Sequence, residues 1–230
     1  MHDCATKCYD TPSMNLDTHF QDCVGKRVLD IGCGTGNLGA ALEGRGNTCY
    51  GVTIAPQEAE LARQRMTQVI VSDIEQTTVL PFPKRFFDVV IFADILEHLR
   101  NPHHALKLVA PHLARNAQIL VSIPNVANIA VRLNLLRGKF DYEPQGILDD
   151  THVRFYTLGS AVELLTSAGY EVRSVKFTNW NWQLPRIIKW LTLGYEWELR
   201  DRMTRWWPGL FATQFVMSAE LLSPDSPVTP

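Results

Sequence analysis

A glycine-rich run early in the chain is the first group of residues that could do chemistry. It follows an apolar segment, precedes a helical pattern and consists of Asp30, Ile31, Gly32, Cys33, Gly34, Thr35 and Gly36. Glycines at such a junction let the backbone turn sharply and let a ligand lie against the main chain without interference from a Cβ atom. Backbone amides at the start of the following helix can then meet a carboxylate or a phosphate group. The run therefore predicts a ligand-binding loop.

Carboxylates and histidines further along the chain form the second such group. Asp94, Glu97 and His98 are spaced i, i+3 and i+4, so a helix would place them on one side. His152 lies in a polar loop that precedes a helical pattern. Histidine is the usual base for removing a proton from a hydroxyl group at neutral pH, and two carboxylates with two imidazoles would also suit Mg²⁺ or Mn²⁺. A base role for His152 or His98 and a purely structural role both rank above a divalent metal, so no metal ligand is assigned.

Strand and helix patterns alternate along the chain and would position both groups. Apolar runs predict strands at residues 28–31, 48–52, 69–71, 87–92, 117–123, 169–177 and 211–222. Helical patterns lie between them at residues 38–43, 56–66, 103–113, 126–137, 158–168 and 183–205. The strand at 87–92 is almost continuously apolar, as a strand covered on both faces should be. The alternation predicts an α/β fold with a mostly parallel sheet wound on both faces.

Length and composition favour one ordinary globular domain. The chain has 230 residues, 46% of them hydrophobic and 20% charged, which suits one well-buried α/β domain. A net charge of −2 predicts no general attraction to nucleic acid or to an anionic membrane. The five cysteines all lie in the first fifty residues without a Cys-x-x-Cys pair, which favours reduced thiols. The N-terminal residues do not resemble a signal peptide, and no apolar run has the length of a membrane span. We therefore expect a cytoplasmic protein.

The segment from residue 28 through the glycine loop resembles, position for position, the first motif of class I S-adenosylmethionine-dependent methyltransferases. The resemblance covers roughly residues 28–177. It implies a Rossmann-like, doubly wound, seven-stranded sheet that is mostly parallel and has an antiparallel last strand. It also implies S-adenosylmethionine as the cofactor and S-adenosylhomocysteine as the product. Gly34, Gly36 and Gly39 satisfy the dinucleotide fingerprint as well, but that match is weak evidence by itself.

The resemblance also implies which residues hold this cofactor. The glycine loop would hold the methionine portion, with Asp30 orienting its ammonium group. Asp73 would take the adenine amino group, and Ile74 would lie beside the ring. Ala93 and Asp94 lie at the carboxyl end of a strand, where open α/β sheets bind ligands. The complete predicted set is Asp30, Gly32, Cys33, Gly34, Gly36, Thr53, Asp73, Ile74, Ala93 and Asp94.

One position departs from the family pattern. The family usually has Asp or Glu at the end of the second strand to hold both ribose hydroxyls, whereas this chain has Thr53. A hydroxyl group cannot form the pair of bonds that a carboxylate forms. Either Thr53 suffices, or Gln57 or Glu58 reaches over, or the affinity for the cofactor is lower than is typical.

The acceptor side of the sequence predicts a reaction type more than a substrate. Residues 123–132 and 146–155 resemble a bacterial subgroup that is commonly tied to sugars, surface glycans or secondary metabolites. This implies O-methylation of a small-molecule acceptor or sugar in natural-product or glycan biosynthesis. The group of acids and histidines also resembles the metal sites of ubiquinone-pathway O-methyltransferases and of small-RNA 2′-O-methyltransferases. A metal-dependent RNA 2′-O-methyltransferase and a catalytically degenerate binding subunit are the alternatives.

We expect a single methyltransferase domain over residues 1–222. Residues 1–25 would form an N-terminal cap segment, and insertions at 124–157 and 180–208 would lie on the acceptor side. Residues 223–230 are expected to be disordered. The six tryptophans, all between residues 180 and 207, favour packing on the sheet or on a second subunit over a lid, which makes a homodimer a candidate.

Overall fold

The computed structural model describes residues 23–178 and 196–222 of the 230-residue chain. Most of the predicted cap segment, the start of the second acceptor-side insertion and the tail after residue 222 lie outside the described residues. Of the tryptophan side chains that are described, Trp206 and Trp207 are both exposed. No helix in the described ranges combines the length and the apolar character that crossing a membrane requires.

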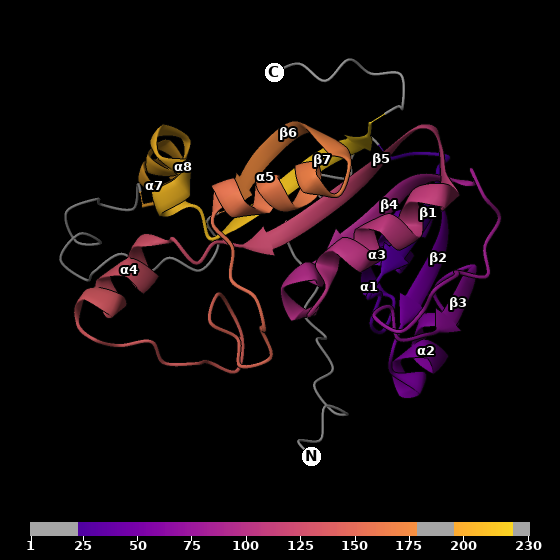
Figure 1. Cartoon of the computed structure of the whole chain (residues 1–230), viewed down its shortest axis with the longest axis horizontal. Coiled ribbons are helices and arrows are strands. Elements are labelled where there is room, and N and C mark those ends of the chain that lie inside the picture. The colour runs from indigo at the N-terminus through magenta and orange to yellow at the C-terminus, as the bar shows by residue number, and fades with distance from the viewer. Residues whose placement is uncertain (1–22, 179–195, 223–230) are drawn as a thin grey trace.

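Seven strands form one sheet in the order β3-β2-β1-β4-β5-β7-β6 (Figure 1). The strands are β1 Arg27–Ile31, β2 Thr48–Thr53, β3 Gln68–Val71, β4 Phe87–Ala93, β5 Leu113–Pro124, β6 Tyr170–Thr178 and β7 Gln214–Leu221. Neighbouring strands from β3 to β5 are parallel, while β7 is antiparallel to both β5 and β6. The prediction of a Rossmann-like, mostly parallel seven-stranded sheet with an antiparallel last strand is confirmed.

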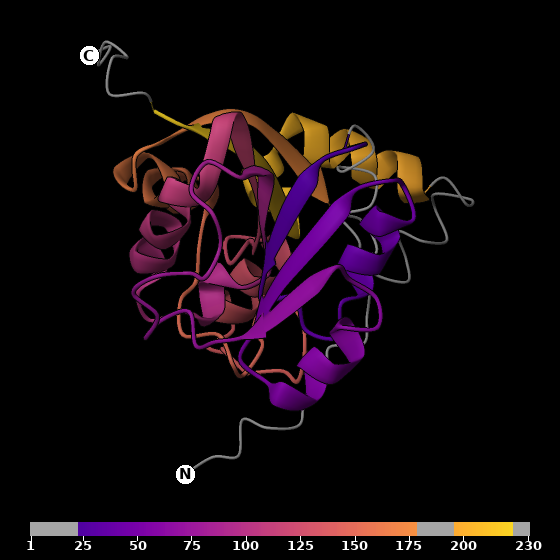
Figure 2. The same ribbon diagram turned by 90° about the vertical axis from the view of Figure 1, so that its right-hand side faces the viewer.

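Helices cover both faces of the sheet (Figure 2). They are α1 Asn37–Glu43, α2 Pro56–Ala62, α3 Pro102–Val109, α4 Ile129–Leu136, α5 Leu158–Ser167, α7 Glu196–Trp206 and α8 Pro208–Phe211, with 3-10 helices η1 Leu96–His98 and η2 Ala110–His112. Successive side chains of a strand point to opposite faces. In β1, Leu29 therefore packs in a core with α3 and α5, and Val28 packs in a second core with α1 and α2. Covering both faces requires the nearly continuous apolar strands that the sequence shows.

Several predicted boundaries are wrong, and the changes at α2, α3 and β7 have local reasons. Helix α2 ends at Ala62 instead of residue 66, because residues 63–66 form turns that bring Met66 beneath the glycine loop. Helix α3 ends at Val109 instead of residue 113, because Pro111 has no amide hydrogen to continue the helix. Pro111 lies in the 3-10 helix η2, and β5 begins directly after it, at Leu113. Strand β7 begins only at Gln214, since the residues before it form α8.

The strand order reverses between β1 and β4, which places a topological switch point at their carboxyl ends. The glycine loop follows β1, and the segment from Asp94 to His98 follows β4. The topology therefore brings both groups of chemically capable residues to the same edge of the sheet, where folds of this class bind ligands.

Candidate active site

The glycine loop leaves β1 in a conformation that glycine adopts most easily. Gly32, Gly34 and Gly36 have φ angles of 80°, 53° and 81°. The amides of Gly32 and Cys33 donate to the carbonyl oxygen of Val52, at 2.8 and 3.0 Å. These bonds fix the loop against β2 independently of any ligand.

The space around each glycine shows which glycines are required by packing and which one is accessible to a ligand. A Cβ atom at Gly39 would lie 2.5 Å from Cε of Met66, and one at Gly36 would lie 2.9 Å from Cα of Ala62. Around a Cβ atom at Gly34, no atom beyond the adjacent residues of the described chain lies within 4 Å. Gly36 and Gly39 are thus explained by the close approach of α1 and α2, whereas Gly34 is the point at which a ligand could reach the main chain.

Asp30 places a buried acid beneath this loop. It lies in β1 and is 2% exposed. Its Oδ1 atom has no hydrogen-bond partner among the described residues. Burial raises the pKa of this carboxyl to about 7. A buried acid with an unpartnered oxygen is suited to an ammonium group, so the amino-acid portion of S-adenosylmethionine fits the residues present here.

The ends of β2 and β3 continue the same edge of the sheet. The Oγ1 atom of Thr53, the last residue of β2, donates to Oε2 of Glu58 in α2, at 3.0 Å. After β3, Oδ1 of Asp73 accepts the amide of Glu75 at 2.9 Å, and Ile74 is buried. The acid that β2 lacks is therefore present close by, on the following helix.

Cys33 is a packing residue in this arrangement. Its Sγ atom would lie 2.6 Å from a Cβ atom placed on Gly51, so its side chain occupies the space that this glycine leaves. Burial, followed by the charges of Asp30 and Glu58, raises the pKa of the Cys33 thiol. A protonated, buried thiol is a poor nucleophile, and no covalent role is assigned to it.

Asp94 turns toward the neighbouring strands and away from the rest of its predicted group. It follows β4 with a φ angle of 51°. Its amide donates to Oγ of Ser122 at 2.9 Å, and its Oδ1 accepts from the same Oγ at 3.0 Å and from Nε2 of Gln214. Ala93, the last residue of β4, pairs with Ser122 on β5. The single helical face predicted for the acids and His98 does not form, because only the short η1 follows this turn.

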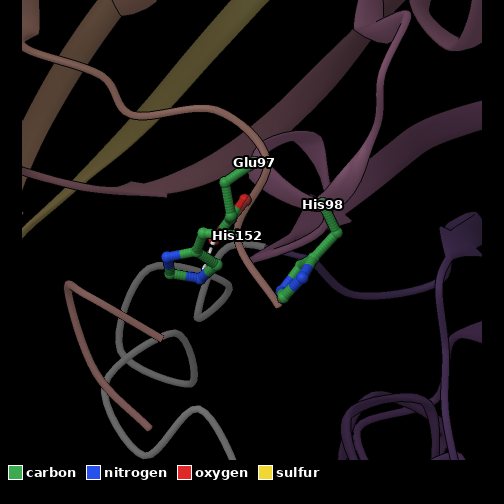
Figure 3. A group of neighbouring side chains, drawn as sticks. All are labelled: Glu97, His98 and His152. Carbon is green, nitrogen blue, oxygen red and sulfur yellow. Dashed lines mark ion pairs between the residues drawn. The ribbon is translucent and has the colours of Figure 1, made fainter. Parts of the chain in front are cut away.

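Glu97, His98 and His152 come together from two separate segments and form what we call the Glu97 cluster (Figure 3). One ligand atom from each residue lies within 4.8 Å of the other two. Nε2 of His152 is 3.9 Å from Oε1 of Glu97. The amides of Val153 and Arg154 both donate to the carbonyl oxygen of Glu97, at 3.0 Å, and hold the loop that carries His152 against η1.

Hydrogen bonds to the backbone orient both imidazoles. Nδ1 of His152 lies 3.1 Å from the carbonyl oxygen of Ile147. Nδ1 of His98 lies 3.3 Å from the carbonyl oxygen of Thr151 and 3.1 Å from its hydroxyl oxygen, which donates its own hydrogen to Oδ1 of Asp149. A carbonyl oxygen only accepts, so each Nδ1 carries the hydrogen and each neutral ring keeps its lone pair on Nε2. The Glu97 cluster can therefore offer the Nε2 lone pair of His152 to a proton or to a metal ion.

Burial sets the charge of the cluster. Glu97 is 1% exposed, and neither of its carboxylate oxygens has a hydrogen-bond partner among the described residues. Burial, together with the charges of Asp94 and Asp149, raises the pKa of Glu97 well above its usual range. Burial lowers the pKa values of His98 and His152. At neutral pH and without a cation, both imidazoles are consequently in the form that accepts a proton.

Aromatic rings stand next to the Glu97 cluster. The ring of Phe155 lies 6.1 Å from that of His152 and 5.6 Å from that of Phe140, which in turn lies 5.7 Å from Tyr142. Phe140 and Tyr142 are 37% and 56% exposed. These three residues, here called the aromatic wall, could contact a flat apolar part of an acceptor molecule.

The structure brings the predicted residues to one edge of the sheet, and their roles toward a cofactor stay predictions. The sequence analysis missed the partners that fix Asp94 and the histidines. Gln214 donates to Asp94, from which it is separated by 120 positions in the sequence. No local sequence pattern predicts this contact, because it depends on the pairing of β5 with β7. Asp149 and Thr151 do have a local signal, since Oδ1 of Asp149 accepts the amide and the hydroxyl of Thr151, at 2.8 and 2.6 Å, in a short turn.

The sheet order, the glycine loop at the switch point and the buried Asp30 together define a class I S-adenosylmethionine-dependent methyltransferase. A family model described as a methyltransferase domain matches residues 15–175. Since this match covers well over half of the chain, the protein belongs to that methyltransferase family and is an enzyme that uses S-adenosylmethionine.

The chain is also similar to curated proteins named ubiquinone biosynthesis O-methyltransferase. The protein from Idiomarina loihiensis is 32% identical over 114 residues, which are 48% of this chain and 47% of that protein. The protein from Rickettsia typhi is 22% identical over 182 residues, which are 75% and 73% of the two chains. The chain spans about half the length of the relatives from Idiomarina loihiensis and Glaesserella parasuis that it matches.

Solved structures agree on the fold. A S-adenosylmethionine-dependent methyltransferase from Archaeoglobus fulgidus has a TM-score of 0.60 at 19% identity, over 92% of this chain and 95% of that one. One from Mesorhizobium loti has a TM-score of 0.58 at 13% identity, over 89% and 94%. Identities this low show a common architecture.

Proposed function

We propose that the protein transfers the methyl group of S-adenosylmethionine to a hydroxyl group of a small aromatic molecule. The observation that carries the proposal is the Glu97 cluster, which presents the Nε2 lone pair of His152 beside Glu97 at the carboxyl end of β4. S-adenosylmethionine supplies an already activated methyl group, so the protein has to align the acceptor and remove its proton. The name shared by the curated relatives supports oxygen as the acceptor atom.

The aromatic wall supports a flat, apolar acceptor. Phe155 lies next to His152, and the exposed rings of Phe140 and Tyr142 lie next to Phe155, so a flat acceptor packed on these rings would lie near the cluster. This favours an aromatic acceptor over the sugar or glycan that the sequence resemblance implied. RNA is disfavoured as well, because a chain of net charge −2 has no general attraction for a polyanion.

In the proposed reaction, His152 acts as the base. Its Nε2 atom accepts the hydroxyl proton while the acceptor oxygen attacks the methyl carbon; the carbon–oxygen bond forms as the carbon–sulfur bond breaks, and S-adenosylhomocysteine leaves. The carboxyl of Glu97, whose Oε1 lies 3.9 Å from that nitrogen, stabilises the imidazolium that results. The hydrogen bond from Nδ1 to Ile147 keeps the ring oriented through the cycle.

A divalent cation held by the same residues is the second candidate mechanism. It is favoured by the two unpartnered, buried oxygens of Glu97. A carboxylate and two imidazoles that each donate Nδ1–H to a carbonyl are a suitable ligand set for a divalent ion. Such an ion would lower the pKa of the acceptor hydroxyl, so that no protein base would be needed.

The test compares His152→Ala with His103→Ala, a histidine on α3 outside the cluster. Release of S-adenosylhomocysteine is measured with a panel of hydroxylated aromatic compounds, and cofactor binding is measured by calorimetry. Loss of a base should lower kcat by about 10²–10⁴-fold in His152→Ala alone, with cofactor affinity unchanged in both variants. Activity that survives EDTA supports the base; activity lost to EDTA and restored by Mg²⁺, Mn²⁺ or Zn²⁺ supports the cation. Methylation of amine or thiol analogues but of no hydroxyl compound would show that the proposal is wrong.

A further inference from the structure

The carboxyl end of β2 lies between the two places that the ends of the cofactor would occupy. In the sheet, β2 stands between β1, which leads into the glycine loop, and β3, which leads to Asp73. The carbonyl oxygen of Thr53 accepts the amide of Ser72 at 2.9 Å, and that of Val52 accepts the loop amides. The ribose of S-adenosylmethionine connects its methionine portion to its adenine, so we expect the ribose hydroxyls at the end of β2.

Thr53 cannot bind both of these hydroxyls itself. It is 4% exposed, and its single hydroxyl hydrogen is donated to Oε2 of Glu58 at 3.0 Å. The same Oγ1 atom accepts the amide of Ala55 at 3.3 Å. A threonine hydroxyl has one hydrogen and two lone pairs, which leaves one lone pair at most for a ligand.

We propose that Glu58 binds the ribose hydroxyls and that Thr53 is a positioning residue that directs the Glu58 carboxylate toward them. A carboxylate can accept a hydrogen bond from each of two neighbouring hydroxyl groups, which is the function of the acid that this chain lacks at the end of β2. Glu58 is half-buried, and its Oε2 atom lies 3.0 Å from Oγ1 of Thr53, so its carboxylate stands at the carboxyl end of β2. The proposal rests on the family assignment and is independent of the acceptor chemistry.

The local structure of α2 explains why Glu58 turns toward the strand. Ala55 is the N-cap of α2, Pro56 comes next, and Glu58 is the third helical residue. An acid at this position often bonds back to the N-cap amide. Here that amide is bonded to Thr53 instead, and the Glu58 carboxylate accepts the Thr53 hydroxyl. If Glu58 served only to accept the Thr53 hydroxyl, its removal would change stability without changing ribose recognition.

The experiment measures binding to the purified protein by calorimetry, with S-adenosylhomocysteine and its 2′-deoxy and 3′-deoxy analogues as probes. Glu58→Gln should weaken S-adenosylhomocysteine binding by roughly tenfold to a hundredfold, as expected for lost bonds to a charged acceptor. The same variant should lose less affinity for each deoxy analogue than for S-adenosylhomocysteine, because one of the two hydroxyl groups that Glu58 would bind is already missing from each analogue. Glu60→Gln is the matched control, because Glu60 lies on the same helix but is exposed and paired with Arg63. Equal losses for all three probes would overturn the proposal.

Two further variants test the role of Thr53. Thr53→Val should weaken binding less than Glu58→Gln does, and the double variant should be no worse than Glu58→Gln alone, because Thr53 acts through Glu58. Thr53→Asp combined with Glu58→Gln returns an acid to the end of β2 and should restore both the affinity and the discrimination against the deoxy analogues. Additive losses, or no rescue in a variant that melts at the normal temperature, would show that Glu58 does not bind the ribose.

Discussion

The cofactor half and the acceptor half of this site are built in different ways. The cofactor half comes from the ends of the adjacent strands β1, β2 and β3 and from the helix after β2. Its loop is tied down by internal hydrogen bonds and close packing. The acceptor half joins η1 to a loop more than fifty residues later, and at its centre lies a carboxylate without a hydrogen-bond partner among the described residues.

The cofactor half therefore recognises its ligand mainly by shape, and the acceptor half mainly by charge. In the cofactor half, most polar groups are satisfied within the protein, and the ligand has to match a formed surface with one buried acid, Asp30. In the acceptor half, Glu97 and the His152 side chain are buried beside the half-buried His98, at a cost in stability that a proton, a cation or an acceptor would reduce. Substitutions in the first half should therefore affect binding, and those in the second should affect turnover and stability in opposite directions.

The largest expected effect is in the cofactor half, at Gly34. Gly34→Val places a branched side chain where the loop faces open space, so it should block cofactor approach and reduce affinity by at least about 10³-fold. Gly46→Val is the matched control, because Gly46 also has a positive φ angle, 84°, and open space but lies in the turn before β2. Both variants should lose similar stability by thermal melting. Unchanged calorimetric binding in Gly34→Val would contradict the assignment of the loop.

Glu97→Gln is expected to lower turnover while making the protein more stable. Removing the buried acid should cost about 10²-fold or more in kcat and leave cofactor affinity unchanged. Since the pKa of Glu97 is raised by folding, the acid destabilises the native state as the pH rises above the range in which the unfolded chain ionises. The variant should therefore gain about 1–3 kcal/mol in unfolding free energy at pH 7, and less near pH 4.

Denaturant unfolding in the presence of EDTA measures this gain. Glu163→Gln, on the exposed face of α5, should change neither stability nor turnover. A less stable Glu97→Gln protein would mean that Glu97 has a structural partner, and the contrast between the two halves would then be lost.

The same contrast explains what could be predicted from the sequence. The strands, the glycine loop and Asp30 follow from local patterns, since an apolar run and a glycine turn carry their own conformational preferences. The departure at Thr53 was also visible, and Glu58 was among the alternatives for it, together with Thr53 itself, Gln57 and a lower cofactor affinity. The sequence could not choose among them, because the choice depends on which way one side chain leaves the first turn of α2.

The acceptor half was predicted less well because its geometry is tertiary. The spacing of Asp94, Glu97 and His98 suggested one helical face, but the turn at Asp94 and its bonds to Ser122 and Gln214 separate it from the others. Those bonds exist only once β7 has paired with β5. His152 and His98 were singled out separately as candidate bases, and the structure places their two rings 4.8 Å apart.

The smallest predicted effect is a pH dependence of cofactor binding that arises at Asp30. Burial raises the pKa of its carboxyl to about 7, so the free protein holds a proton there at lower pH. The ammonium group of S-adenosylhomocysteine requires the ionised carboxylate, so binding must release that proton. Affinity should be constant above pH 8 and fall about tenfold for each pH unit below 7. The neighbouring thiols of Cys33 and Cys49 do not contribute, because burial raises their pKa values far above this range.

Calorimetry in two buffers of different ionisation enthalpy, from pH 5.5 to 8.5, would count the released proton directly. Asp30→Asn should bind more weakly at pH 8 and show no dependence between pH 6 and 8, since an amide does not titrate. A retained slope in Asp30→Asn would assign the proton to another group. An affinity that does not change with pH in the unaltered protein would mean that Asp30 is already ionised in the free protein. The cofactor half would then have both the shape and the charge that the ligand requires before the ligand binds.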